Sequence, residues 1–221
     1  MHDALLLIGH SNSGKSPLGS YLEQLLSGPS RRFIHCDFGH LLRGVCAGAV
    51  DAGLSAGDLA YVRSVMQGTL ITREHFPVIH AVMAWFLARS RVRPAADILI
   101  LNGMPRNIDQ AGELGRMEIA VRAVIRLDCT VETALERKKA SESGAGFEER
   151  GGRGDATAEI FGRKIRSYEQ ETAPLLEYYV ARRTPVFDVT VLTQTSPDDM
   201  VAAIGAQRLL DVFSAGTGVG V

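Results

Sequence analysis

The sequence predicts an α/β protein with a doubly wound, parallel five-stranded sheet and helices on both faces. Two observations support this prediction. Short, uninterrupted apolar runs alternate along the 221 residues with longer segments of helical periodicity. The first run, at residues 4–8, is apolar throughout and is followed by a glycine, which is typical of a strand buried on both faces of a parallel sheet. Right-handed crossovers would then distribute the helices over the two faces.

The remaining elements follow in order. Leucines 18, 22, 25 and 26 recur at helical spacing behind Pro17, so a helix is expected after the first strand. Four further strands are predicted at residues 33–36, 98–101, 121–127 and 185–191. Further helices are predicted at residues 78–88, 131–137 and 159–179. In the last of these helices, we expect the side chains at one face to be core residues: Tyr168, Leu175, Leu176 and Tyr179.

Two segments do not fit this simple alternation. Residues 38–75 have mostly helical patterns and separate the second strand from the third, which predicts a helical insert. Residues 141–155 are rich in Gly, Ser, Glu and Arg and contain almost no apolar residue except Phe147, which predicts a mobile flap. Residues 1–221 are expected to form a single domain that contains both segments.

Composition excludes several classes of protein. The chain has 24 Lys and Arg against 25 Asp and Glu, and a net charge of -1 creates no overall field that would attract nucleic acid or an anionic membrane. Its 3 cysteines form no C-x-x-C pair, which argues against a disulfide framework and a zinc site. No apolar segment is long enough to cross a bilayer. We therefore expect a cytoplasmic monomer without nucleic-acid or membrane partners.

Residues 9–16 match the phosphate-loop pattern G-x-x-x-x-G-K-S/T between a predicted strand and a predicted helix. Such a loop presents main-chain N–H groups to a polyphosphate. Lys15 would reach the β- and γ-phosphates, and Ser16 would ligate Mg²⁺. His10 occupies a position that the motif leaves open, and we expect it only to fill the loop. The nucleotide-binding residues expected here are Gly9, Asn12, Ser13, Gly14, Lys15, Ser16 and Pro17.

A second motif follows the predicted third strand. Residues 102–111 read NGMPRNIDQA, which places Arg106 at the carboxyl edge of the sheet, where ligands bind in open α/β folds. An arginine at that edge is a candidate phosphate clamp, because its planar fork pairs with phosphate oxygens.

Together these motifs resemble the adenylate kinase family of nucleoside monophosphate kinases, over most of the chain. Residues 102–111 are similar to the family's DGFPRT-x-x-QA motif, and residues 38–43 to its TGDMLR segment. Residues 68–72 resemble the GxLVT stretch that lines the acceptor base. Residues 153–155 and 168–179 resemble the segments that close the lid, and Arg137 falls on the first arginine of the lid hinge.

The resemblance implies a phosphotransferase that moves the γ-phosphoryl group of ATP, with Mg²⁺, to a nucleoside monophosphate. Arg43 and Arg106 would grip the acceptor phosphate, and Gln110 would read adenine, which makes AMP the first candidate. The acceptor residues implied are Phe38, Gly39, Arg43, Gly68, Ile71, Gly103, Arg106 and Gln110. The residues implied in phosphoryl transfer are Lys15, Arg106, Arg137, Arg153 and Lys164. ATP and the nucleoside monophosphate would be the only partners.

Three positions depart from the family pattern. Asn102 replaces the aspartate that holds Mg²⁺ waters, Phe38 replaces the base-reading threonine, and Ser141 lies near the second hinge arginine. Two alternatives therefore stay open. One is a kinase of a small alcohol, with Asp37 as the base that the hydroxyl would need. The other is a nucleotide-sensing homologue with little turnover, for which Asn102 and Ser141 are the supporting features.

Overall fold

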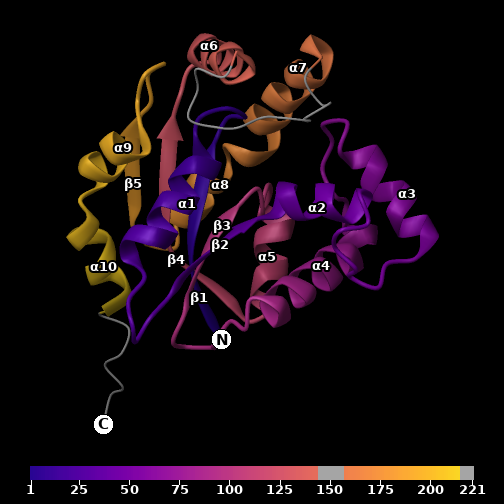
Figure 1. Cartoon of the computed structure of the whole chain (residues 1–221), viewed down its shortest axis with the longest axis horizontal. Coiled ribbons are helices and arrows are strands. Elements are labelled where there is room, and N and C mark those ends of the chain that lie inside the picture. Colours follow the sequence, from indigo (N-terminus) through magenta and orange to yellow (C-terminus); the bar gives the residue numbers. More distant parts are fainter. Residues whose placement is uncertain (144–156, 215–221) are drawn as a thin grey trace.

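A computed structural model describes residues 1–143 and 157–214 of the protein. Its centre is a parallel sheet with the strand order β2-β3-β1-β4-β5 (Figure 1). The strands are β1 (His2–Gly9), β2 (Phe33–Asp37), β3 (Ile98–Asn102), β4 (Ile119–Asp128) and β5 (Val186–Thr190). The predicted α/β fold with a five-stranded parallel sheet is confirmed, and each strand overlaps the apolar run that predicted it.

Helices cover both faces because side chains along the central strands alternate between two cores. Leu6 and Leu99 point into one core, and Leu5 and Ile100 into the other. The helices that contribute to the first core are α2 (Phe38–Cys46), α3 (Ala56–Val65), α4 (Phe76–Arg89), α5 (Ile108–Arg116) and α8 (Leu175–Val180). Those that contribute to the second are α1 (Lys15–Leu26), α6 (Val131–Glu142), α7 (Ala158–Ser167), α9 (Pro197–Ile204) and α10 (Ala206–Ser214).

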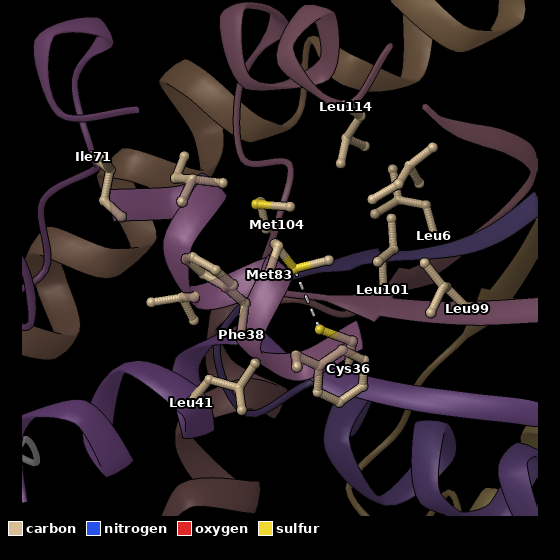
Figure 2. Close-up of a cluster of buried hydrophobic side chains, with 14 of the residues drawn as sticks. Leu6, Cys36, Phe38, Leu41, Ile71, Met83, Leu99, Leu101, Met104 and Leu114 are labelled. Carbon is tan, nitrogen blue, oxygen red and sulfur yellow. Dashed lines mark hydrogen bonds between the residues drawn. The ribbon is translucent and has the colours of Figure 1, made fainter. Parts of the chain in front are cut away.

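Figure 2 shows the first core at the end of β2. The ring of Phe38 lies among Leu41, Met83 and Met104, and the thiol of Cys36 lies 3.7 Å from the sulfur of Met83. Burial raises the pKa of the Cys36 thiol, which therefore stays protonated. The first turn of α2 is thus anchored in the core, and this anchoring fixes the direction in which the helix leaves the sheet.

Residues 38–75 contain α2, α3 and the short 3₁₀ turn η1 (Arg73–His75). In Figure 1, α3 lies at the outer side of α2 and α4, away from the sheet. A capping box at Ser55 and Asp58 begins α3, since each side chain accepts from the other residue's backbone N–H. Among the described residues, no helix is both long and apolar enough to span a bilayer.

The predicted continuous helix at 159–179 is wrong in one respect. Helix α7 ends at Ser167, the π-helical turn η2 (Tyr168–Thr172) follows, and α8 begins only at Leu175. Pro174 has no N–H group and cannot continue the pattern of α-helical hydrogen bonds, which explains the interruption. Leu175 and Tyr179 are buried as expected, but Tyr168 and Leu176 are only partly buried.

Gly19 lies where α1 crosses β2 and is expected to be essential for this packing. A Cβ atom at this position would lie 2.5 Å from Cδ2 of the partly buried His35 ring. We predict that Gly19→Ala lowers the free energy of unfolding by about 1–3 kcal/mol through overpacking. Urea denaturation measures the effect.

The matched control is Gly112→Ala in α5, where an added Cβ meets no atom of the described residues within 4 Å. This variant should gain about 0.5–1 kcal/mol, because alanine is the better helix former. Equal stability of the two variants would contradict the prediction.

Asp97 links the residues that precede β2 and β3 to the segment that follows α4. Its carboxylate is fully buried and accepts hydrogen bonds from the backbone N–H groups and the guanidinium groups of Arg32 and Arg93. Burial favours the neutral acid, but the hydrogen bonds from Arg93 and Arg32 outweigh it and hold the pKa of Asp97 well below its usual value.

A folded-state pKa below the unfolded one means that ionised Asp97 stabilises the fold above about pH 4 and that this contribution is lost as the pH falls further. We therefore predict that Asp97→Asn is less stable than the parent by about 3 kcal/mol at pH 7. The difference should shrink between about pH 4 and pH 2. Thermal unfolding across this range, with Asp211→Asn as an exposed control, would refute the prediction if the difference stayed constant.

Candidate active site

A cleft opens at the carboxyl ends of β1, β2 and β3, where the loops that follow these strands meet. Five separated parts of the chain line it: the phosphate loop, the start of α2, residues 65–71, residues 102–110, and the segment from α7 to η2. Most of the residues expected to bind substrate are therefore brought together. Those that line the cleft are Gly9, Asn12, Lys15, Ser16, Phe38, Gly39, Arg43, Gly68, Ile71, Gly103, Arg106, Gln110 and Lys164.

The phosphate loop joins the end of β1 to the start of α1. Asn12 and Gly14 have φ angles of 68° and 99°, in the left-handed region that favours glycine. A Cβ at Gly9 would lie 2.6 Å from Oγ of Ser13, so the loop also needs glycine there. Ser13 and Gly14 belong to the loop, and Pro17 to the first turn of α1. In the described structure, these three residues are not among those that line the cleft.

The ammonium group of Lys15 lies across the loop. Its Nζ donates to the backbone oxygens of Gly9 at 2.7 Å and His10 at 2.6 Å. The cation is therefore held at the mouth of the cleft, beside the N-terminus of α1, where main-chain N–H groups and the helix dipole favour an anion.

Ser16, Asp37 and Asn102 form a polar cluster on the wall next to Lys15. The Ser16 hydroxyl donates to Oδ2 of Asp37 at 2.6 Å, and the Asn102 amide donates to the same oxygen at 3.1 Å. The other carboxylate oxygen accepts from the backbone N–H of His40 at 2.8 Å and caps α2. Burial opposes ionisation of Asp37, but the bonds from Ser16 and His40 give it a pKa below the usual value.

Mg²⁺ prefers oxygen ligands, such as hydroxyl and carboxylate groups. The side chains of Ser16 and Asp37 therefore fit such an ion. By contrast, no three His, Cys, Asp or Glu side chains of residues 1–143 and 157–214 gather in a way that could hold a metal. A divalent ion at Ser16 would therefore need further ligands, such as water and phosphate oxygens, which is common for Mg²⁺.

Arg106 is positioned by its main chain. Its backbone N–H donates to Oε1 of Gln110 at 2.9 Å, and its carbonyl accepts from the Thr172 hydroxyl at 2.8 Å. The guanidinium approaches Oγ of Ser167 at 3.4 Å. Burial lowers the pKa of Arg106 to about 10, so the side chain is still charged at neutral pH. A desolvated guanidinium interacts more strongly with an anion than one in water.

Gln110 is engaged at both ends of its amide. Besides accepting from Arg106, it donates from Nε2 to the backbone oxygen of Ile71 at 3.1 Å. Gln110, which the resemblance implies to read adenine, thus connects the wall that contains Arg106 to the wall that contains Ile71. Phe38 is 4% exposed, so its ring contributes to the core more than to the cleft surface.

Arg137 lies beside the phosphate loop and, in the described structure, is not among the residues that line the cleft. Its guanidinium donates to the carbonyl oxygens of Asn12 at 3.2 Å, Leu192 at 2.9 Å and Thr195 at 3.0 Å. It joins the loop to the segment after β5. Arg153 lies outside the described residues. The roles in phosphoryl transfer expected for these two arginines remain predictions.

Helix α7 forms the wall opposite the phosphate loop. Lys164 lines the cleft, and Nε of the neighbouring Arg163 donates to the backbone oxygen of Gln67 at 2.9 Å. Gly68 has a φ of 106°, and a Cβ there would lie 3.2 Å from Cβ of Arg163. The close contact between α7 and residues 67–68 therefore depends on this glycine.

Tyr168 is a cleft residue that the sequence pattern assigned to the core. Its ring lies 4.1 Å from that of His10, centroid to centroid, so η2 contacts the phosphate loop directly. Burial and then the charge of Lys15 lower the pKa of His10 and keep it neutral. Pro174 signals the interruption of the helix in the sequence, but no local pattern identifies His10 as the partner of Tyr168.

The chain is similar to several known proteins. It is 28% identical over 186 residues to an adenylate kinase of Stenotrophomonas maltophilia, covering 81% of this chain and 87% of the relative. An adenylate kinase of Xanthomonas euvesicatoria pv. vesicatoria is 28% identical over 182 residues, covering 80% and 86%. The structure of a gluconokinase from Sinorhizobium meliloti superposes with a TM-score of 0.52 and 14% identity, covering 97% of each chain. No family model matches.

These similarities confirm the resemblance to adenylate kinases that the motifs indicated. The solved structure shares the fold of this chain. Together they support a P-loop kinase, and they leave the acceptor of the phosphoryl group to be determined.

Proposed function

We propose that this chain transfers the γ-phosphoryl group of Mg·ATP to a nucleoside monophosphate, with AMP as the first candidate. The observation that carries the proposal is the convergence of four cationic side chains from separated segments on one cleft: Lys15, Arg43, Arg106 and Lys164. A triphosphate and a monophosphate facing each other need such a concentration of positive charge, because phosphoryl transfer depends on positioning and electrostatic stabilisation.

The reaction breaks the bond between the γ-phosphorus and the oxygen that bridges it to the β-phosphorus. A new bond forms between the γ-phosphorus and a phosphate oxygen of the acceptor, and ADP leaves with the bridging oxygen. An acceptor phosphate is already ionised at neutral pH, so no side chain has to remove a proton.

Each wall of the cleft would have its own task. The main-chain amides of the phosphate loop would hold the ATP phosphates, and Lys15 would lie near the β- and γ-oxygens. Arg43 and Arg106 would hold the acceptor phosphate, while residues 68–71 and Gln110 would lie against its base. Mg²⁺, held by Ser16 and phosphate oxygens, would neutralise charge on the moving group. Residues 38–75 would serve as the acceptor-binding insert and residues 138–154 as the lid.

A panel of acceptors tests the proposal. AMP, GMP, CMP, UMP and their deoxy forms would each be incubated with ATP and Mg²⁺, and ADP formation measured by a coupled assay. Small alcohols and sugar acids would be included in the same panel. Turnover with at least one nucleoside monophosphate, well above that with every alcohol, is expected. Turnover restricted to an alcohol would refute the proposal.

A kinase of a small alcohol is the alternative candidate, in which Asp37 would be the base. The carboxylate lies at the cleft beside Ser16, where it could accept a proton from an acceptor hydroxyl. If Asp37 is such a base, Asp37→Asn should abolish transfer to the alcohol while ATP binding persists. The alcohol arm of the panel must first yield a substrate for this candidate to stand.

A further inference from the structure

The carboxyl ends of β2 and β3 lie side by side in this sheet. The two strands are parallel neighbours, and their register pairs Asp37 with Asn102 as the last residues of the two strands. Neighbouring strands are about 4.8 Å apart, so side chains at these paired positions can reach the same atom. The adenylate kinase pattern has an aspartate at the end of the third strand, where this chain has the neutral Asn102.

The hydrogen bonds show that Asp37, at the end of β2, places a negative charge beside the neutral Asn102. Oδ2 of Asp37 accepts from the Ser16 hydroxyl at 2.6 Å and from the Asn102 amide at 3.1 Å, and that amide also donates to Oγ of Ser16 at 3.1 Å. The three side chains form a closed triangle of hydrogen bonds. Because Ser16 is the metal-ligating position of the phosphate loop, the carboxylate of Asp37 adjoins the place of a bound cation.

We infer that Asp37 takes over the task of the missing strand-three carboxylate, holding the Mg²⁺ of Mg·ATP at Ser16, while Asn102 orients it. The inference rests on the ATP-binding part of the proposed function and requires nothing of the acceptor. Asp37 is assigned as a positioning residue for the metal and its waters, with Asn102 as its hydrogen-bond partner. Such outer partners commonly change metal affinity by about 10–100-fold.

The geometry favours this task over that of a base. One oxygen of Asp37 caps α2 through the N–H of His40, and the other already accepts from both Ser16 and Asn102. Both oxygens are thus engaged by groups of the chain itself. A base would need an oxygen within reach of the acceptor hydroxyl.

The test moves the carboxylate from β2 to β3 by substitution and measures the effect on metal affinity. Mn²⁺ would be titrated into the full chain with a non-hydrolysable ATP analogue, and its dissociation constant read from the electron paramagnetic resonance of free Mn²⁺. Asp37→Asn should weaken Mn²⁺ about 10-fold or more. The double variant Asp37→Asn with Asn102→Asp returns a carboxylate to strand three and should restore the affinity to within about threefold of the parent.

Controls separate metal binding from folding. Asp37→Asn and Asp37→Ser both retain a side chain able to cap α2, so both should still fold cooperatively and share the loss of Mn²⁺ affinity. Glu132→Gln, at an exposed position of α6, should leave Mn²⁺ binding unchanged. Two results would overturn the inference: unchanged Mn²⁺ affinity in Asp37→Asn, or a double variant that binds as weakly as the single one.

The titration contains no acceptor, so its result is separate from that of the acceptor panel. Failure of every nucleoside monophosphate in the panel, combined with the expected Mn²⁺ result, would refute the proposed acceptor and retain the role of Asp37. Turnover with a nucleoside monophosphate, combined with unchanged Mn²⁺ affinity in Asp37→Asn, would retain the proposed acceptor and refute the role of Asp37.

Discussion

Replacement of Arg106 by alanine should lower kcat with a nucleoside monophosphate by about 10²–10³-fold, as loss of one preorganised donor does in other enzymes. The guanidinium lies in the cleft and is desolvated enough to bring its pKa to about 10. Its interaction with phosphate oxygens would therefore be strong, and water cannot fully replace it. Steady-state kinetics with ATP and the best acceptor of the panel measure the effect.

The fold should tolerate Arg106→Ala, because Gln110 and Thr172 bind the backbone of this residue and not its side chain. Arg106→Lys retains the charge without the planar fork and is expected to recover only part of the rate. Arg89→Ala removes an exposed arginine at the end of α4 and serves as the matched control. An unchanged kcat/KM in Arg106→Ala would exclude this residue from the acceptor site.

Replacement of Lys15 by methionine should also reduce turnover by about 10²–10³-fold. The ammonium group would meet charge that develops between the β- and γ-phosphates, whereas the main-chain amides of the loop would still bind ATP. We therefore expect kcat to fall more than the affinity for ATP does. Kinetics and calorimetric ATP titration, run on the same preparation, separate the two quantities.

Lys15→Met should fold normally, since the contacts known for its ammonium group are with carbonyls of its own loop, Gly9 and His10. Lys139→Met removes an exposed lysine of α6 and is the control for loss of a positive charge. If Lys15→Met lost ATP affinity with kcat unchanged, the lysine would bind the ground state and the transition state alike, contrary to the expectation.

The sheet and most helices could be predicted from the sequence because their signals are local. An apolar run such as that in β3, or the leucine spacing of α1, reflects burial that each element needs in any α/β fold. The phosphate loop is similarly local, since its glycines satisfy backbone requirements within residues 9–16.

Other features depend on partners far apart in the chain, which periodicity does not record. Arg137 bonds to Leu192 and Thr195, and Tyr168 packs on His10, so both contacts arise only when the sheet is assembled. The π-helical turn η2 begins at Tyr168, which packs only partly buried against the core that contains Leu175. The hydrogen bond from Gln110 to the backbone oxygen of Ile71 is another contact that forms only in the folded chain.

The pairing of Asp37 with Asn102 also bears on how distant relatives should be compared. Adjacent parallel strands end at the same edge, so an acidic group can move from one strand to the next and still serve the same point in space. Aligned column by column, such an exchange looks like the loss of one essential residue and an unrelated change sixty-odd positions away. At the sheet edge itself, the inferred exchange keeps a negative charge beside the phosphate loop and supplies it from β2 in place of β3.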